Sequence, residues 1–500
     1  MDPADTGTVG RAMVRGTLWM VSMRWVIRLI GLVNTAILAR LLSPTDFGLV
    51  AVAMIAVDLI ITITDGDIEM ALVRAADAPA ELLHTGWTLK IIAGIVAWGL
   101  VTALAVPVSI HFGDPRIADI LRIVALRPLI LGFESIGIIW FRRTLNFAME
   151  FRYLVGQRVL SFLSGIALVL VLRDYSALAW SMPAQALVTV ALSHAIAPAT
   201  PGLRLSLSCW RDFWQFSRWQ ILFNAARLAG ERCDPLVISR LGTLGETGLY
   251  VVGFDLAMMP TREIMLPAGR ALMPTYARVA HDAKALAGSF RLVLGFAAII
   301  ACAVGVGMSV IAEDAVLVVL GEQWRGAIPF VRWLGIFGAL EGVWLMLDPV
   351  LIASGRERTL AVANLAFAAI AVIAVTAAAT VLGIDAIPAA RIAVMVAVLA
   401  GIFVRILAWK WISPAELASI LWRPVAAAAG MAAAITLLHP DSLSSPLAGM
   451  AVDIALGAAV YPALLLGLWR LSGCPGGPES AVVDMALARW RHRRTPGPDG

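Results

Sequence analysis

The sequence predicts an all-α polytopic membrane protein with about fourteen transmembrane helices, on three observations. Hydrophobic residues make up 60% of the 500 positions and charged residues only 15%, whereas a soluble domain is nearer half apolar and a quarter charged. The mean hydropathy is +0.85. The apolar residues also gather in runs of the roughly 20 residues that a spanning helix needs. A transmembrane β-barrel would instead show alternating strands of about ten residues.

Fourteen such runs follow one another along the chain. Their approximate limits are 17–41, 46–65, 84–109, 118–141, 153–173, 176–197, 214–239, 246–268, 288–312, 328–353, 359–382, 387–409, 415–438 and 446–470. Two further segments mix charged and apolar residues. We expect residues 270–287 to lie along the membrane surface, and residues 478–494 to form an interfacial helix or a basic tail.

A short sequence in the first six runs is repeated in the next six. Residues 39–52 read ARLLSPTDFGLVAV and residues 239–252 read SRLGTLGETGLYVV. Without gaps, Arg40 aligns with Arg240, Asp46 with Glu246, and Gly48 with Gly248. A duplication within a hydrophobic chain is typical of transporters that have two related halves around a central cavity.

The repeat predicts two pseudo-symmetric six-helix lobes around a central cavity, plus two C-terminal helices. The expected divisions are a cytoplasmic N-terminus at 1–16, a first lobe at 17–200, a cytoplasmic linker at 201–213, a second lobe at 214–411, two additional transmembrane helices at 412–471, and a cytoplasmic basic tail at 472–500.

The net charge of +5 is explained by topology, because the basic residues collect on one side. With the N-terminus in the cytoplasm, the opposite loops carry only Arg40, Arg116, Arg173, Arg240 and Arg325. Basic residues favour the cytoplasmic side, so both termini are expected there, and an even number of spans agrees. Nucleic acid is not an expected partner.

Charged residues inside the runs are the candidate site, because each costs at least ~2.5 kcal/mol by insertion scales. Arg24 and Arg28 lie one helical turn apart near the middle of the first run, which holds no acidic residue. A guanidinium group binds two phosphate oxygens at once and stays charged inside a membrane. This face therefore favours a diphosphate group.

The seventh run, the repeat equivalent of the first, carries a polar stripe. Its members are Asn224, Arg227, Glu231 and Asp234, at helical spacing. An ion pair within the stripe and a contact with substrate are both compatible with this pattern. Acids available to balance the arginines, or to couple an ion, are Asp58, Glu134, Asp255, Glu341 and Asp348.

No pattern points to chemical catalysis. The four cysteines form no metal-ligand spacing, and the sequence lacks nucleotide-binding, metalloprotease and hydrolase motifs. We therefore expect a protein that is not an enzyme, with no catalytic residues, no cofactor and no metal. The loops on the predicted external side are short, which argues against a membrane glycosyltransferase or polymerase.

Several segments resemble a known family. The stretch GTLWMVSMRWVIRLIGLVNTAILARLLSPTDFGLVAVA is similar to the start of the polysaccharide-transporter (Wzx-type) oligosaccharide flippases of the multidrug/oligosaccharidyl-lipid/polysaccharide exporter superfamily. CDPLVISRLGTLGETGLYVVGFDLAMMP, LMPTYARV and VLVVLGEQWRGAIPFVRWLG agree in order and spacing, so that the resemblance covers about residues 10–410. The mixed signs of the seventh run depart from a purely cationic cavity.

The resemblance implies a flippase that moves undecaprenyl-diphosphate-linked oligosaccharide from the cytoplasmic to the periplasmic leaflet of a bacterial inner membrane, by alternating access, for exopolysaccharide or lipopolysaccharide synthesis. Membrane lipids, a polysaccharide polymerase and export machinery are the further partners it implies. Two alternatives stay open within the superfamily: a small-molecule or drug cation antiporter, which would need a dominant acidic site, and a peptidoglycan-precursor flippase.

Overall fold

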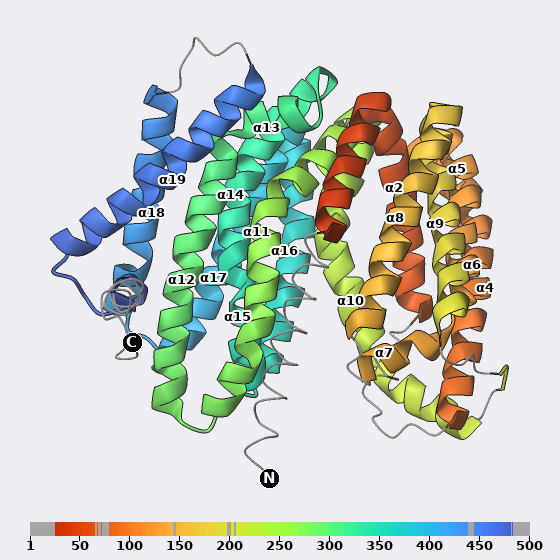
Figure 1. Cartoon of the computed structure of the whole chain (residues 1–500), viewed down its shortest axis with the longest axis horizontal. Helices are drawn as coiled ribbons and strands as arrows, with labels where there is room; N and C mark the ends of the chain where they lie inside the picture. Colours follow the sequence, from red (N-terminus) through yellow and green to blue (C-terminus); the bar gives the residue numbers. More distant parts are fainter. Residues whose placement is uncertain are drawn as a thin grey trace, which may run out of the picture. The chain divides into compact units, whose positions relative to one another are not determined.

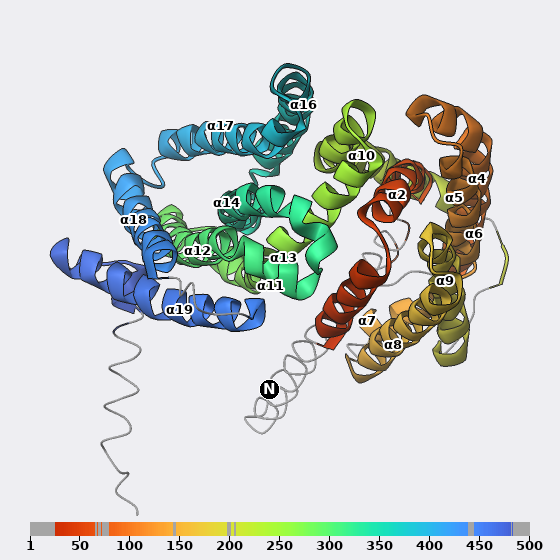
Figure 2. The ribbon, with the colours of Figure 1, turned by 90° about the horizontal axis from the view of Figure 1, so that it is seen from above.

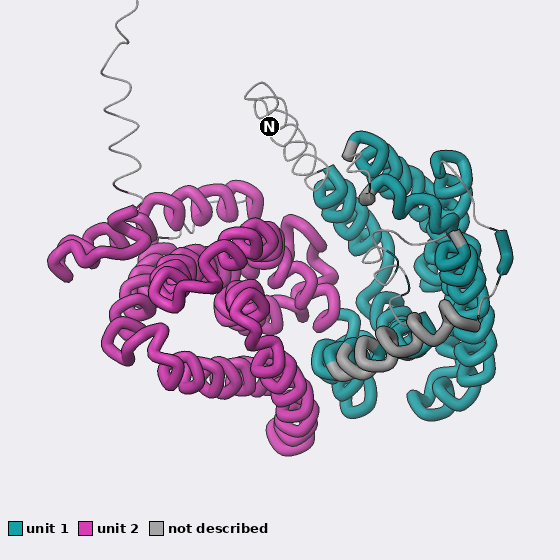
Figure 3. Tube along the Cα trace, turned by 90° about the horizontal axis from the view of Figure 1, so that it is seen from below, with its two compact units in different colours: residues 1–248 teal, residues 249–500 magenta. Residues whose placement is uncertain are grey.

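The computed structural model describes residues 26–65, 68, 72, 80–143, 147–197, 202–204, 207–438, 445–481 and 483, and every regular element within these ranges is a helix (Figure 1). The chain divides into two compact units, Met1–Gly248 and Leu249–Gly500 (Figure 3). The boundary falls in the first turns of one long helix, α11 (Leu244–Val279).

The first unit begins with a helix over residues 26–41. It continues with α2 (Pro44–Asp65), α4 (Ala80–Phe112), α5 (Arg116–Val124), α6 (Leu126–Gly132), the 3-10 turn η1 (Ile136–Ile138), α7 (Ile139–Arg143), α8 (Phe147–Leu172), α9 (Tyr175–Ile196) and α10 (Leu207–Leu241). Helix α2 packs against α4, α5 and α10, while α9 packs against α6 and α8.

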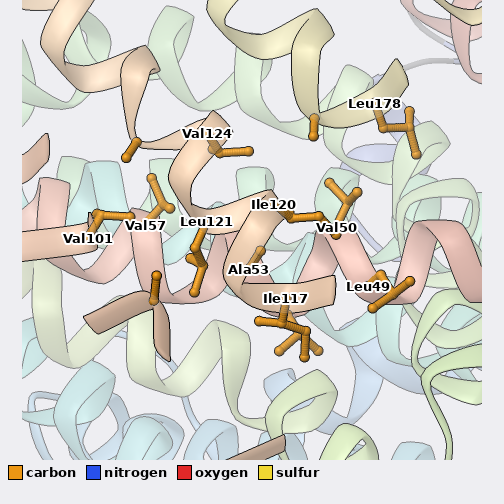
Figure 4. Close-up of a cluster of buried hydrophobic side chains, with 14 of the residues drawn as sticks. Leu49, Val50, Ala53, Val57, Val101, Ile117, Ile120, Leu121, Val124 and Leu178 are labelled. Atoms are coloured by element: carbon orange, nitrogen blue, oxygen red, sulfur yellow. The ribbon is translucent and has the colours of Figure 1, made fainter. Parts of the chain in front are cut away.

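Aliphatic side chains fill the centre of the first unit (Figure 4). Leu49, Ala53 and Val57 lie four residues apart on α2 and so share one face of that helix. They meet Ile117 and Leu121 of α5, which are also fully or almost fully buried. This packing places α5 beside α2.

The second unit contains the remainder of α11, then α12 (Ala283–Val310), α13 (Ala312–Val319), η2 (Glu322–Ala327), α14 (Ile328–Leu345), α15 (Leu347–Ala353), α16 (Glu357–Leu382), η3 (Ile384–Ala386), α17 (Ile387–Ala408), α18 (Pro414–Leu438) and α19 (Pro446–Leu471). Figure 2 shows α18 and α19 beside α12. Tyr461 of α19 donates a hydrogen bond to the Ile299 carbonyl of α12 at 2.7 Å.

Helices α12 and α14 pack closely because glycines face each other across the contact. A Cβ atom on Gly305 would lie 2.5 Å from the Ala339 nitrogen, and one on Gly335 would lie 2.7 Å from the Ser309 nitrogen. Small residues of this kind let helix backbones approach each other in lipid, where packing supplies the association energy.

The repeated sequence forms the same helix start twice. Ser43 and Asp46 make a capping box at the start of α2, in which the Ser43 nitrogen donates to Asp46 Oδ2 at 2.9 Å and the Asp46 nitrogen to Ser43 Oγ at 3.3 Å. Thr243 and Glu246 repeat it at the start of α11, at 2.7 and 3.1 Å. The acidic residue of each copy therefore closes its own first turn.

The two repeated glycines, both in the first unit, lie against each other's segment. A Cβ atom on Gly48 would come 1.7 Å from the Leu244 carbonyl oxygen, and one on Gly248 would come 1.9 Å from the Pro44 carbonyl oxygen. The contact is therefore reciprocal. Only glycine fits either position without moving backbone.

The all-α membrane architecture predicted from the sequence is confirmed. Ten helices in the described ranges are long and apolar enough to cross a bilayer. Their outward surfaces carry exposed apolar side chains such as Val171, Val381 and Leu437, each at least 79% exposed, as contact with lipid requires. The protein is a multi-pass membrane protein. The lobe limits expected at 200 and 214 stay a prediction.

Two local predictions differ from the structure. The fourth run, 118–141, is broken into α5, α6, η1 and α7 rather than one helix. Residues 270–287 do not form a separate surface segment, because α11 continues to Val279 and α12 begins at Ala283. The Asp282 side chain accepts bonds from the Lys284 and Ala285 nitrogens and thereby caps α12. Of residues 478–494, only 478–481 and 483 are described, and they are helical.

Candidate functional site

A polar pocket of about 240 Å³ lies among the helices of the first unit. We call it the arginine pocket. It is lined by Arg127 of α6, by Leu154, Gln157, Arg158 and Ser161 of α8, by Met182, Gln185, Ala186 and Thr189 of α9, and by Ile27 and Leu131. Among the described residues that line it, none is acidic.

Helical spacing brings these side chains together. On α8 the lining residues recur every three or four positions, and the same holds on α9, so that each helix turns one polar face to the pocket. Gln157 Nε2 donates to Thr189 Oγ1 at 2.6 Å, and Thr189 Oγ1 donates to the Gln185 carbonyl at 2.9 Å. These bonds link α8 to α9 and hold the amide groups in place.

The pocket is strongly cationic. Arg158 Nε is buried and has no hydrogen-bond partner among the described residues. The Arg158 guanidinium lies against helix 26–41, where a Cβ atom on Gly31 would come 2.7 Å from Nη2. Arg28, one turn earlier on that helix, interacts with Arg158 as a like charge. An anion in the pocket would relieve this repulsion and supply oxygen acceptors.

Ion pairs balance other charges around this pocket. Arg232 Nη2 of α10 lies 3.4 Å from Asp58 Oδ2 of α2, and Asp58 also attracts Arg127. Glu134 accepts from Lys90 Nζ at 2.9 Å and from the Tyr153 hydroxyl at 2.6 Å. Lys90 and Glu134 line a second pocket of about 260 Å³ that also touches Leu131.

The six site residues predicted from the sequence have different surroundings. Arg24 lies outside the described residues, whereas Arg28 adjoins the arginine pocket. Arg227 and Glu231 form an ion pair at 2.9 Å on the exposed surface of α10. Asn224 is half-buried on the same helix, and Asp234 is fully buried with its Oδ1 3.2 Å from Cys233 Sγ.

The acids proposed for charge balance in the second unit also differ from one another. Glu341 Oε1 accepts from Arg262 Nη2 at 2.6 Å. Asp255 is exposed. Asp348 Oδ1 is buried and has no hydrogen-bond partner in the part of the chain that the structure describes.

Sequence reasoning missed the uncharged part of the arginine pocket. Gln157, Ser161, Gln185 and Thr189 are uncharged and sit in apolar runs, so a criterion based on charge does not select them. Their spacing was the available signal, because Gln157 and Ser161, like Gln185 and Thr189, are four residues apart on one helix face. Arg127 and Arg158 belong to different apolar runs, so the sequence does not show that they lie together.

The described residues hold no cluster of three or more His, Cys, Asp or Glu side chains suited to a metal ion. The pocket residues can bind an anion and donate hydrogen bonds to hydroxyl groups, since guanidinium and amide groups supply both.

The fold and this pocket define the class of protein, a polytopic α-helical membrane protein with a cationic interior site. A family model described as "Polysaccharide biosynthesis protein" matches residues 37–329, and the chain belongs to this family.

Two curated relatives match this chain over more than 60% of its length. The chain is 23% identical over 353 residues to the lipopolysaccharide biosynthesis protein WzxC of Escherichia coli strain K12, covering 69% of this chain and 70% of that protein. It is 29% identical over 317 residues to the succinoglycan biosynthesis transport protein ExoT of Rhizobium meliloti strain 1021, covering 62% of each.

Among solved structures, the lipid II flippase MurJ in its inward closed conformation has the same fold. The TM-score is 0.75 at 11% identity, and the match covers 91% of this chain and 99% of that one. The likeness shows the fold. The resemblance to oligosaccharide flippases noted in the sequence is confirmed by the family model and the named relatives.

Proposed function

We propose that the protein is a flippase that moves undecaprenyl-diphosphate-linked oligosaccharide from the cytoplasmic to the periplasmic leaflet of a bacterial inner membrane, by alternating access and without chemical catalysis. Its glycan serves exopolysaccharide or lipopolysaccharide synthesis, and both termini lie in the cytoplasm. The family description and the names of the two relatives support a role in polysaccharide export.

The arginine pocket is the observation that carries this proposal. Arg127 and Arg158 present guanidinium groups inside a membrane protein, with amide and hydroxyl groups beside them and no acid in the described lining. A diphosphate with attached sugars needs this combination, because the diphosphate binds cations and the sugar hydroxyls bind neutral hydrogen-bonding groups. On the sequence alone, Arg24, Arg28 and Arg227 stay proposed contacts for the diphosphate, and Asn224, Glu231 and Asp234 stay proposed polar groups for the sugars.

The same pocket argues against the drug antiporter, since an organic cation would be repelled by Arg127 and Arg158. A peptidoglycan-precursor flippase would also bind a diphosphate. Growth separates the two, because loss of a peptidoglycan flippase is lethal, whereas loss of a polysaccharide flippase removes only the polymer.

The test replaces Arg158 and Arg127 by Gln, singly and together, in a strain that lacks the chromosomal copy. Loss of one charge-assisted contact should lower export by about tenfold or more. Arg158→Lys, which keeps the charge, should restore part of it. Exported polysaccharide and lipid-linked oligosaccharide retained in the cytoplasmic leaflet are measured against the amount of inserted protein.

Arg122→Gln is the matched control, because Arg122 lies on the exposed face of α5 and pairs with Asp119, at 3.2 Å. It should export normally. The double change Arg24→Ala with Arg28→Ala should abolish export while the protein stays inserted. Normal export by both this variant and the Arg127/Arg158 double variant would refute the proposed function.

A further inference from the structure

The second unit contains a polar cavity of its own, and a role for it does not depend on the proposed function. A cavity of about 520 Å³ opens between α12, α18 and the segment after α19. We call it the α12–α18 cavity. It is lined by Gly288, Arg291 and Leu292 of α12, by Glu416, Ser419, Ile420 and Arg423 of α18, and by residues 475–478.

The segment after α19 is a fixed wall of this cavity. Pro478 fits a notch on α12, where a Cβ atom on Gly295 would come 2.5 Å from its Cγ atom. The Pro475 carbonyl accepts a bond from Trp469 Nε1 at 3.0 Å, and the Gly477 nitrogen donates to Ser480 Oγ at 2.9 Å. These contacts hold residues 475–480 under the ends of α12 and α18.

Arg423 forms the floor of the cavity with an unused donor. Its side chain is 3% exposed, and its Nη1 lies 2.7 Å from Oε1 of Glu479, which is 2% exposed. Nε donates to the Ser419 carbonyl at 3.2 Å. Within the described ranges Nη1 makes no hydrogen bond despite this ion pair, and Nη2 has no hydrogen-bond partner either. A buried guanidinium group with an unsatisfied donor is costly, so an acceptor oxygen in the cavity is favourable.

The mouth of the cavity carries a second arginine. Arg291 Nη1 donates to Glu416 Oε1 at 2.5 Å, and both side chains are about 40% exposed. Two arginines and one glutamate therefore line the cavity, while Glu479 is held behind Arg423. The net positive lining favours an anionic ligand.

The cavity lies near the N-terminal ends of α12 and α18. Arg291 and Arg423 lie eight and nine residues after the first residues of these helices, or about 12–14 Å along each axis. The two helices are 28 and 25 residues long, so they exceed a hydrocarbon core of about 30 Å by roughly 8–12 Å in total. The two arginines therefore lie just inside one edge of the core, where long side chains reach the headgroups. Leu292, which lines the cavity, is 40% exposed and continues its wall onto the apolar outer surface.

We propose that the α12–α18 cavity binds the phosphate group of a membrane phospholipid, with Arg423 Nη2 and the Arg291 guanidinium as donors and the acyl chains leaving past Leu292. Bound there, the lipid joins α12, α18 and the C-terminal segment. A free phosphate ion shares the headgroup's chemistry, but it gains nothing from the apolar exit.

The experiment fills the cavity without touching its charges. A Cβ atom on Gly288 meets nothing within 4 Å, so Gly288→Leu places a side chain in the cavity with no backbone clash. Gly401→Leu is the matched control, because Gly401 on α17 is also open and lies outside the cavity. Purified full-length protein in detergent is titrated with dihexanoyl phosphatidylglycerol, and bound lipid is counted by native mass spectrometry.

The unchanged protein and Gly401→Leu should retain one lipid in a saturable manner, and Gly288→Leu should retain none. Arg291→Gln should bind about tenfold more weakly, as expected for one lost charge-assisted contact. Equal retention by Gly288→Leu and Gly401→Leu would overturn the site. Displacement of the lipid by inorganic phosphate at equal concentration would overturn the lipid assignment, because the free ion would then be the ligand.

Discussion

Removing one partner of the buried Arg423–Glu479 pair should destabilise the second unit strongly. Both side chains are at most 3% exposed and their charged atoms lie 2.7 Å apart. Glu479→Ala leaves a buried guanidinium that, among the described residues, keeps only its hydrogen bond to the Ser419 carbonyl. Breaking such a pair costs about 3–5 kcal/mol. Because Arg423 also faces a cavity that can admit water, the lower figure is expected.

The assay is thermal unfolding of the purified protein in detergent. For a unit of this size about 1 kcal/mol shifts Tm by roughly 2–4 °C, so about 3 kcal/mol corresponds to a fall of roughly 6–12 °C. Glu322→Ala is the control, because Glu322 pairs with Arg325 on the surface and is 72% exposed. Its Tm should stay close to that of the unchanged protein.

A double variant distinguishes the destabilisation caused by an unpaired buried charge from the net stabilisation that the ion pair contributes. Arg423→Met with Glu479→Leu removes both charges and retains volume, so its Tm should lie above that of Glu479→Ala. If Glu479→Ala and Glu322→Ala unfold at the same temperature, the pair is not buried and the reasoning fails.

Two further predictions concern the first unit. Gly48→Ala should sharply reduce folded, inserted protein, since its Cβ atom would lie 1.7 Å from the Leu244 carbonyl oxygen; normal yield and Tm would contradict the reciprocal contact. The Arg116 side chain, through its hydrogen bonds, lowers the pKa of Asp114 below 3.8. Asp114→Asn should therefore lower the free energy of unfolding by about 1 kcal/mol or less above pH 3.8. The difference in Tm from the unchanged protein should vanish as the pH falls through the folded-state pKa of Asp114. A difference in Tm that does not depend on pH would exclude the Arg116–Asp114 interaction as its cause.

The helices were predictable because a bilayer demands long apolar runs whose backbone groups are satisfied internally. Where prediction failed, the local composition was ambiguous. The run 118–141 is mainly apolar, yet the helix breaks after Val124, next to Ala125. Alanine favours helix, so nothing at that position marks a break, although Pro128 just beyond it is a known disturbance.

The missed continuity of α11 has a different cause. Residues 270–287 are amphipathic, and that pattern is typical of a helix lying on a membrane surface. The segment instead belongs to two long helices that meet at a tight turn before Asp282. The capping preference of Asp282 was present in the sequence, but composition averaged over the segment concealed it.

The site was only partly predictable. Charge at depth is costly, so arginines inside apolar runs were visible without a structure. Their grouping was not, because Arg127 and Arg158 belong to different helices and meet only through packing of α6, α8 and α9. Neutral hydrogen-bond donors such as Gln157 cost less to insert into a membrane than arginine does, so their presence in an apolar run does not by itself indicate a site.

The sequence repeated 200 residues apart serves the helix scaffold rather than substrate binding. Two of the three matched pairs have a structural reason: the acids at 46 and 246 close capping boxes, and the glycines at 48 and 248 permit reciprocal backbone contact. The charges differ where the repeats differ, since Arg28 aligns with Leu228. A duplicated scaffold that keeps its helix starts while its polar interior diverges can receive a substrate whose two ends are chemically unlike. A diphosphate joined to sugars is such a substrate, and the arginine pocket, all in the first unit, suits the diphosphate end.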